Sequence, residues 1–157
     1  MVKLDKFDIG ILRLLQQDAK LTTKEIAAQL GLTNTPVYER IKRLERKGYI
    51  KKYVALLDKH KIDRSLTAFC NVSLKVHSKI FLDRFEKEIL ELEEVMECYH
   101  IAGLYDYLLK VVVKDMEQYR NFITQKLAVF ENIGNVQSSF VMTAIKHSTA
   151  YPFSKNQ

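Results

Sequence analysis

The sequence has little of what disulfide chemistry and metal binding require. Its 157 residues include two cysteines, Cys70 and Cys98, which lie far apart and belong to no CxxC pair. We expect both to be reduced and to pack as small hydrophobic side chains. The histidines show no i, i+4 or HxH spacing, so we predict neither a metal site nor a cofactor. They are His60, His77, His100 and His147.

Long apolar segments and catalytic motifs are also missing. The longest apolar run, residues 107–113, is interrupted by Lys110 and is far shorter than the roughly 20 residues that cross a bilayer. The first residues, MVKLDKFD, lack the apolar core of a signal peptide, so we expect a cytoplasmic protein. No nucleophile with a base, carboxylate pair or Gly-rich phosphate loop is present, which disfavours an enzyme.

What the chain does contain is an early pair of short predicted helices joined by a tight turn. Thr22 and Glu25 have the spacing of a capping box, which starts the first helix. Gly31 suits the left-handed residue that ends a helix. Pro36 is compatible only with the first turn of the second helix, which should therefore begin within about two residues of Asn34.

The second helix of this pair has an apolar face and a polar, cationic face. Counting 100° per residue places Val37, Ile41 and Leu44 on the apolar side. A helix of this kind, in a helix-turn-helix over about residues 22–47, fits the major groove of duplex DNA. The candidate DNA-contacting residues are Thr33, Asn34, Thr35, Tyr38, Glu39, Arg40, Lys42, Arg43, Arg46, Lys51 and Lys52.

Positive charge is concentrated in the same part of the chain. Residues 1–64 contain 15 Lys and Arg against 8 Asp and Glu, a net charge of +7, whereas residues 65–157 carry a net charge of −1. An isolated charge run is usually a solvated helix face, but here it coincides with a candidate recognition helix, which favours a polyanion-binding surface. Lys51 and Lys52 are expected to touch only the DNA backbone.

Several of these residues admit a second interpretation. Arg40 lies near the border between the two faces, where it suits an ion pair or a phosphate contact, and Tyr38 can pack beside Val37. Arg43 is a candidate base contact, and Glu39 can either accept from a cytosine amino group or pair with Arg43. A helical hairpin that binds RNA or another protein is an alternative to DNA binding.

Alternating and helical periodicities follow the charged segment 58–65, where we place the domain boundary. Helices are predicted to begin near Ser78 and Asp115, and strands over residues 66–76, 95–102, 107–113 and 136–145. The order β-α-β-β-α-β is that of a ferredoxin-like unit. Residues 50–57 have the composition of a strand or wing. We predict an α+β fold with a winged helix-turn-helix domain over residues 1–60 and a ferredoxin-like domain over 61–157.

A ferredoxin-like sheet carries both helices on one face, so its other face needs cover. A second copy of the chain can supply that cover, giving a symmetric dimer that presents two basic domains to a palindromic DNA site. The tail, residues 151–157, holds two aromatic side chains that can pack on a neighbouring surface.

The connection Gly103-Leu104-Tyr105-Asp106 also has two interpretations. As part of a ligand site, Gly103 permits close backbone approach and Asp106 can accept an α-ammonium group. As a plain hairpin connection, it uses Asp106 for a hydrogen bond back to the backbone.

Three stretches carry a resemblance to a known family: LDKFDIGILRLLQQDAK, EIAAQLGLTNTPVYERIKRLERKGYIKKYVALLD and HIAGLYDYLLKVVVKDMEQYRNF. Over essentially its whole length the sequence resembles the leucine-responsive regulatory protein family, also called Lrp/AsnC or feast/famine regulators. The resemblance implies a bacterial or archaeal transcriptional regulator with a winged helix-turn-helix and an amino-acid-sensing domain. It further implies homodimers that assemble to higher oligomers, up to octamers, on double-stranded DNA.

Family ligands are typically amino acids bound between dimers near the Gly-x-x-Asp turn, which implies an effector site in the second half of this chain. A Ser or Thr at the start of the last strand corresponds to Ser138 or Ser139, although the family's usual Pro-Gly-Val before that strand is here Asn132-Ile133-Gly134. The effector residues implied by the resemblance are Gly103, Tyr105, Asp106, Tyr107, Ser138 and Ser139.

Overall fold

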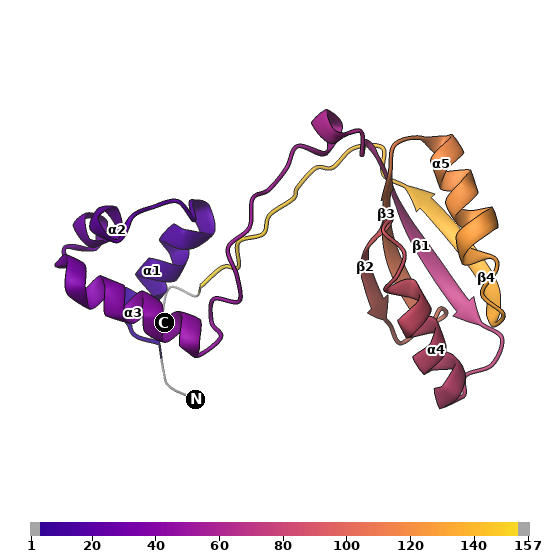
Figure 1. Ribbon diagram of the computed structural model, residues 1–157, viewed down its shortest axis with the longest axis horizontal. Helices are drawn as coiled ribbons and strands as arrows, with labels where there is room; N and C mark the ends of the chain where they lie inside the picture. Colours follow the sequence, from indigo (N-terminus) through magenta and orange to yellow (C-terminus); the bar gives the residue numbers. More distant parts are fainter. Residues whose placement is uncertain (1–3, 154–157) are drawn as a thin grey trace. The chain divides into compact units, whose positions relative to one another are not determined.

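The computed structural model describes residues 4–153, whose contacts divide the chain into two compact units. The first unit combines residues up to Leu56 with those from Ile145 onwards, and the second spans Leu57–Ala144 (Figure 1). The start of MVKLDKFD and the end of the tail, residues 1–3 and 154–157, lie outside the described part. The expected boundary placed residues 145–153 in the second domain, whereas their contacts group them with the first unit.

The first unit is built from three helices. They are α1 (Lys6–Gln17), α2 (Thr23–Leu30) and α3 (Asn34–Arg46). Their apolar stripes meet in a small core with side chains that include Ile11, Ile26, Val37 and Leu44. The two helices of the predicted helix-turn-helix, α2 and α3, therefore form with the expected inner face.

The turn between α2 and α3 follows the local signals in the sequence. Thr22 and Glu25 form the reciprocal capping box at the start of α2. Gly31 ends α2 in the left-handed conformation with φ 65°, and no atom lies within 4 Å of where its Cβ would be. Thr33 is the N-cap of α3 but makes no side-chain capping bond.

The segment after α3 forms no strand. Residues 51–57 are exposed and pair with no strand of the described chain, although their apolar side chains fit the strand that the sequence predicts there. The short helix η1 (Lys59–Ile62) lies in the charged segment chosen as the boundary. Within residues 4–153, no helix is both long and apolar enough to cross a bilayer.

The second unit is a four-stranded antiparallel sheet with strand order β2-β3-β1-β4. The strands are β1 (Leu66–Leu74), β2 (Val95–His100), β3 (Tyr107–Val113) and β4 (Ile133–Phe140). The connecting helices are α4 (Lys79–Ile89) and α5 (Met116–Asn121), the latter continued by a π-helical stretch, η2 (Phe122–Leu127). This is the predicted ferredoxin-like order.

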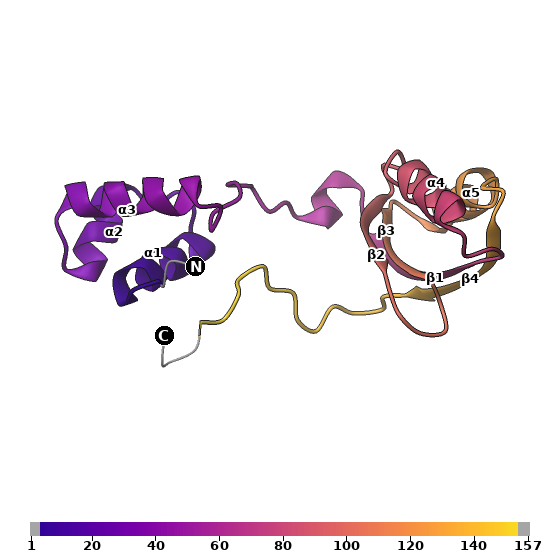
Figure 2. The same cartoon turned by 90° about the horizontal axis from the view of Figure 1, so that it is seen from below.

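Both helices of the second unit cover the same face of the sheet (Figure 2). Alternate residues of β1 and β3, such as Cys70 and Leu109, are fully buried under them. The residues between these, including Phe69, Leu108 and Val112, are only half-buried on the opposite face. One chain therefore leaves one face of its sheet partly uncovered.

The last strand begins earlier than predicted. β4 starts at Ile133 and ends at Phe140, whereas the sequence pattern suggested residues 136–145. The reason is the close approach of Gly134 to β1, where a Cβ would lie 3.1 Å from the carbonyl oxygen of Ser73. The pairing of β1 with β4 shifts its register there, between Ser73 and Leu74. Because of this irregularity, the start of β4 is not visible in a simple alternation of polar and apolar residues.

Candidate nucleic-acid interface and effector site

The exposed side of α3 is the candidate nucleic-acid interface. The N-terminal residues of the helix and its outer face are open to solvent, including Asn34, Thr35, Glu39 and Arg46. Tyr38 is also 48% exposed, so it does not pack into the core beside Val37. This arrangement leaves the first two turns of α3 free to meet the edges of bases.

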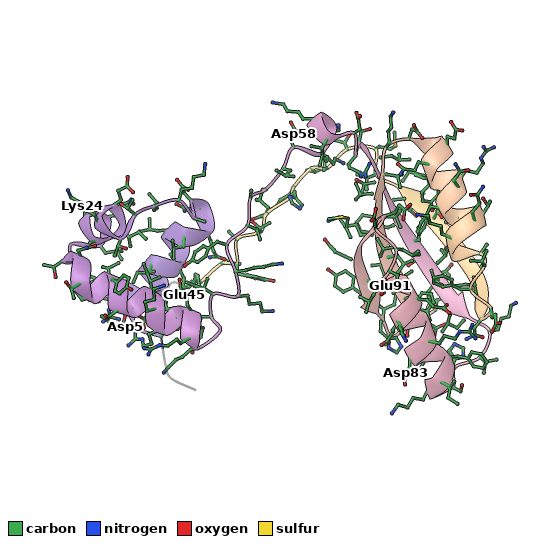
Figure 3. The ribbon with its side chains drawn as sticks, in the orientation of Figure 1. Asp5, Lys24, Glu45, Asp58, Asp83 and Glu91 are labelled. Atoms are coloured by element: carbon green, nitrogen blue, oxygen red, sulfur yellow. The ribbon has the colours of Figure 1, made fainter. Side chains whose placement is uncertain are left out.

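Two arginines of α3 are directed towards α1. Arg40 Nη1 lies 2.6 Å from Asp5 Oδ2 and 2.8 Å from Asp8 Oδ1, and Arg43 Nη2 lies 2.6 Å from the same Asp8 oxygen. Figure 3 shows Asp5 beside α3. Arg40 thus forms the ion pair that one of its two interpretations expected, and Arg43, expected to contact a base, forms an ion pair as well.

A second set of contacts lies on the other flank of α3. Lys42 Nζ is 2.9 Å from Glu45 Oε2 and 5.8 Å from the centre of the Tyr38 ring. The Tyr53 hydroxyl donates to Glu45 Oε1 at 3.0 Å. Burial of Tyr53 and its bond to this carboxylate raise the pKa of the Tyr53 hydroxyl to about 12. Glu45 therefore ties the segment after α3 back to the helix.

The remaining cations of this region form no ion pair within residues 4–153, and all are exposed. They are Arg46, Lys47, Lys51 and Lys52. Unpaired exposed cations release counterions from a nucleic acid when they bind its phosphates. The positive charge available to a polyanion is thus concentrated at the C-terminal end of α3 and just beyond it.

The turn before β3 uses Asp106 as a structural hydrogen-bond acceptor. Its Oδ2 accepts from the backbone N–H of Leu74 at 2.7 Å, and Oδ1 lies 3.0 Å from His77 Nε2. The backbone of Asp106 also bonds to Val72 and Ile101. Asp106 therefore makes the side-chain-to-backbone bond expected of a plain connection, while its carboxylate keeps a partly exposed edge.

The other implied effector residues do not surround one cavity of the described chain. The Tyr105 hydroxyl donates to Gln137. The Tyr107 hydroxyl donates to Glu86 at 2.9 Å on the helix-covered face, where burial and this bond raise the pKa of the Tyr107 hydroxyl. Gly103 has φ 150° in an exposed turn. These positions share a sequence motif but not a pocket in a single chain.

Ser138 and Ser139 lie on opposite faces of β4. Ser138 pairs with Cys70 and accepts from the Tyr119 hydroxyl beneath the helices, whereas Ser139 pairs with Phe69 on the uncovered side. Burial raises the pKa of both the Cys70 thiol and the Tyr119 hydroxyl in this cluster. Ser138 sits in the middle of β4 and not at its start, because the strand begins at Ile133.

A surface depression of about 310 Å³ lies beside Tyr107. It is lined by Glu86, Ile89, Leu90, Cys98, His100 and Tyr107. The His100 ring stacks on Tyr107 with centroids 4.8 Å apart. Among the described residues no group of three or more His, Cys, Asp or Glu is placed to hold a metal.

Sequence reasoning missed the acidic partners of these sites. None of Asp5, Asp8 and Glu86 was connected with these sites from the sequence, and His77 was considered only as a metal ligand. The capping spacing of the two aspartates is visible in the sequence, but their pairing with Arg40 joins residues more than 30 positions apart. No local pattern signals such a contact.

A three-helix unit with an exposed cationic helix, joined to a separate ferredoxin-like unit, defines a class: transcriptional regulators that combine a DNA-binding head with a ligand-binding domain. The family model described as "Winged helix-turn-helix DNA-binding" matches residues 4–51. The model described as "Lrp/AsnC ligand binding domain" matches residues 67–151. The chain belongs to the Lrp/AsnC family of transcriptional regulators.

Characterised relatives match nearly the full chain. The Bkd operon transcriptional regulator of Pseudomonas aeruginosa is 36% identical over 152 residues, covering 97% of this chain and 99% of the relative. The leucine-responsive regulatory protein of Escherichia coli is 37% identical over 145 residues, covering 92% of this chain and 88% of the relative. These matches confirm the family expected from the sequence.

Solved structures of related proteins have the same fold as this chain. A transcriptional regulator from Neisseria meningitidis, determined as a complex with L-Met, superposes with a TM-score of 0.92 at 35% identity, covering 96% of this chain and 97% of that one. An AsnC family regulator from Agrobacterium tumefaciens gives a TM-score of 0.90 at 40% identity, covering 95% and 97%. The predicted α+β fold class is therefore confirmed, and the family is not one of enzymes.

Proposed function

We propose that this protein binds specific sites on double-stranded DNA through α3, and that an amino acid bound by the second unit modulates its DNA binding or assembly. The observation that carries the proposal is the exposed face of α3, which ends in unpaired cations within a helix-turn-helix. Action on DNA also accounts for the expected location in the cytoplasm of a bacterial or archaeal cell.

The contact residues fall into two groups by position. Thr33, Asn34, Thr35, Tyr38 and Glu39 lie in or before the first two turns of α3, where a recognition helix meets base edges. Lys42 is partly held by Glu45, and the unpaired Arg46, Lys51 and Lys52 suit phosphates. Base readout is thus assigned to the start of α3 and backbone contact to its end.

The test is a titration at several salt concentrations with three probes of equal length. These are duplex DNA from upstream of the protein's own gene, a shuffled duplex, and single-stranded RNA of the upstream sequence. We expect the upstream duplex to bind tightest and its affinity to fall steeply with salt. Equal affinity for all three probes, or preference for the RNA, would contradict the proposal.

Lys51→Ala tests the assignment to the DNA backbone. Because Lys51 is exposed and forms no ion pair within residues 4–153, its loss should weaken specific and shuffled duplexes alike and reduce the salt slope by roughly one counterion. Lys87→Ala removes the same charge from the second unit and should change neither value. A loss confined to the specific duplex would move Lys51 to base readout.

For the effector, we propose an amino acid whose α-ammonium group lies beside Asp106. Support comes from the Lrp/AsnC ligand-binding match and from the relative solved with L-Met, which makes L-Met the first probe. Asp106→Asn keeps an oxygen for the Leu74 N–H but removes the charge that an ammonium group requires. We expect calorimetry to show that L-Met or another tested amino acid binds to the wild type. The same amino acid should bind to D106N at least tenfold more weakly.

Asp83→Asn is the matched control, because Asp83 is an exposed carboxylate on α4 of the same unit. It should bind the amino acid as the wild type does. An unchanged affinity in D106N would place the ligand elsewhere, with the Glu86 and Tyr107 depression as the next site to test.

We further propose that the chain forms a symmetric homodimer through the uncovered face of its sheet, and that dimers assemble further, up to an octamer. The half-buried apolar side chains of Phe69, Leu108 and Val112 support this face as the contact. Leu108→Lys should shift the mass measured by light scattering towards the monomer. An unchanged mass in this variant would exclude that face from the dimer.

A further inference from the structure

Asp8 is a carboxylate in an unusual place. Asp8 is only 3% exposed, and among the described residues the only other buried polar or charged residue is Thr67, at 7%. A buried carboxylate is stable only when paired and hydrogen-bonded. Asp8 meets that requirement entirely with groups from its own helix terminus and from α3, the candidate recognition helix.

The geometry concentrates two guanidinium groups on one oxygen. Asp8 Oδ1 lies 2.8 Å from Arg40 Nη1 and 2.6 Å from Arg43 Nη2. Asp5 Oδ2 takes a second short contact from Arg40 Nη1, at 2.6 Å. The backbone N–H of Asp5 donates to the other oxygen of Asp8 at 3.3 Å, which completes the α1 capping box.

The net charge of this cluster has a functional consequence. Two carboxylates face two guanidinium groups, so the cluster contributes no net charge to the surface that would meet DNA. Arg40 and Arg43 are one turn apart on the flank of α3 that faces α1, and their side chains are 24% and 36% exposed. Two guanidinium groups of α3 are therefore already paired with carboxylates in the absence of DNA.

We propose that Asp8 is a positioning residue that holds Arg40 and Arg43 away from the phosphate backbone while it fixes α3 against α1. The inference rests on the proposed DNA binding and deepens it by assigning a residue that limits sequence-independent affinity. Phosphate contacts raise affinity for every sequence equally, whereas base contacts distinguish sequences. Withholding two cations therefore lowers the affinity for every sequence and makes binding less dependent on salt, while the base contacts still distinguish sequences.

Replacement of Asp8 by Asn gives the direct test. Asn keeps nearly the same shape and an oxygen acceptor but not the charge, and both arginines are exposed enough to turn towards solvent. We expect D8N to bind shuffled duplex DNA more tightly than the wild type, with a salt slope steeper by about one to two counterions. Each added contact should increase the loss of affinity between 50 and 200 mM salt roughly threefold.

Asp18→Asn is the matched control. It removes the same charge from the other end of α1, where the Asp18 side chain accepts only from the backbone N–H of Lys20 in the described structure. We expect D18N to retain the wild-type salt slope and the wild-type affinity for shuffled DNA. A change in D18N equal to that in D8N would show a general charge effect and overturn the proposal.

Arg43→Gln tests the same idea without disturbing the buried carboxylate's other partners. In the wild-type background it should leave the salt slope unchanged, because Arg43 is already engaged by Asp8. In the D8N background it should remove about one counterion of the gained slope. The R43Q single variant remains decisive if D8N, checked by circular dichroism, does not fold.

Three outcomes would count against the inference. A folded D8N with the wild-type salt slope and the wild-type affinity for shuffled DNA would overturn it alone, and so would an R43Q single variant whose slope falls by one counterion. A wild-type protein that binds no duplex DNA would overturn the proposed function and this inference with it. The wild-type titration in the same assay thus separates the two failures.

Discussion

At the scale of single residues, the acidic side chains at the start of α1 serve two purposes at once. Asp5 accepts from the backbone N–H groups of Phe7 and Asp8, which caps the helix, and it also pairs with Arg40. Capping is a local requirement, but ion pairing with α3 is a tertiary one. The same carboxylate therefore links helix initiation to the placement of the recognition helix.

Asp5 also gives a pH prediction. Its burial alone would raise its pKa, but hydrogen bonds from the Asp8 backbone and Arg40 outweigh this, so the pKa of Asp5 lies below the usual 3.8. A depressed pKa stabilises the folded state above pH 3.8, and this contribution is lost as the pH falls through the folded-state pKa. Replacing Asp5 by Asn removes this contribution. We therefore expect the stability difference between the wild type and D5N to shrink progressively below about pH 4.

Thermal unfolding midpoints of wild type and D5N, measured at intervals between about pH 2 and pH 7, check this prediction. The two curves should be separated at neutral pH and converge in acid. Parallel curves over the whole range would mean that the ionised form of Asp5 does not contribute to stability.

At the scale of elements, the helix-turn-helix is specified almost wholly by local chemistry. A capping box starts α2, a left-handed glycine ends it, and Pro36 falls within the first turn of α3. Each signal acts within four residues, so each is visible in the sequence. The strand β4 is different, because its start depends on how closely Gly134 approaches β1.

Gly31 is the element-scale test. Gly31→Ala should lower the free energy of unfolding of the first unit by about 1–2 kcal/mol, because φ 65° is strained for a residue with a Cβ. No atom lies within 4 Å of the added Cβ, so the cost is conformational and not steric. Gly31→Asn is the matched variant, since Asn tolerates this conformation and should cost clearly less. Equal losses in chemical denaturation would contradict the explanation.

At the scale of the whole molecule, the chain crosses between its two units twice. The second crossing returns the tail to the first unit, where the Gln16 side chain exchanges two hydrogen bonds with the backbone of Tyr151, at 2.7 and 3.3 Å. Phe153 packs against the head core, with the Arg13 guanidinium 5.8 Å from its ring centre. The aromatic tail thus has a partner on α1 within its own chain.

Phe153→Ala tests whether this contact stabilises the head. Loss of a partly buried aromatic ring should reduce stability by on the order of 1 kcal/mol, seen as weaker protection of α1 amides in hydrogen exchange. Tyr151→Ala is the control, because the Tyr151 ring is 81% exposed and only its backbone bonds to Gln16. If both variants exchange at the wild-type rate, the tail does not stabilise α1.

The sequence by itself determined the helix-turn-helix, the order of strands and helices in the second half, and the basic character of the first. These follow from capping, periodicity and charge, which act over a few neighbouring residues. Only the tertiary structure decided that Arg40 and Arg43 pair with Asp8, that Ser138 and Ser139 face opposite ways, and that the tail rejoins the head. The physical reason is that ion pairs, strand register and packing join residues that are distant in the chain, and their energies depend on geometry that no local pattern contains.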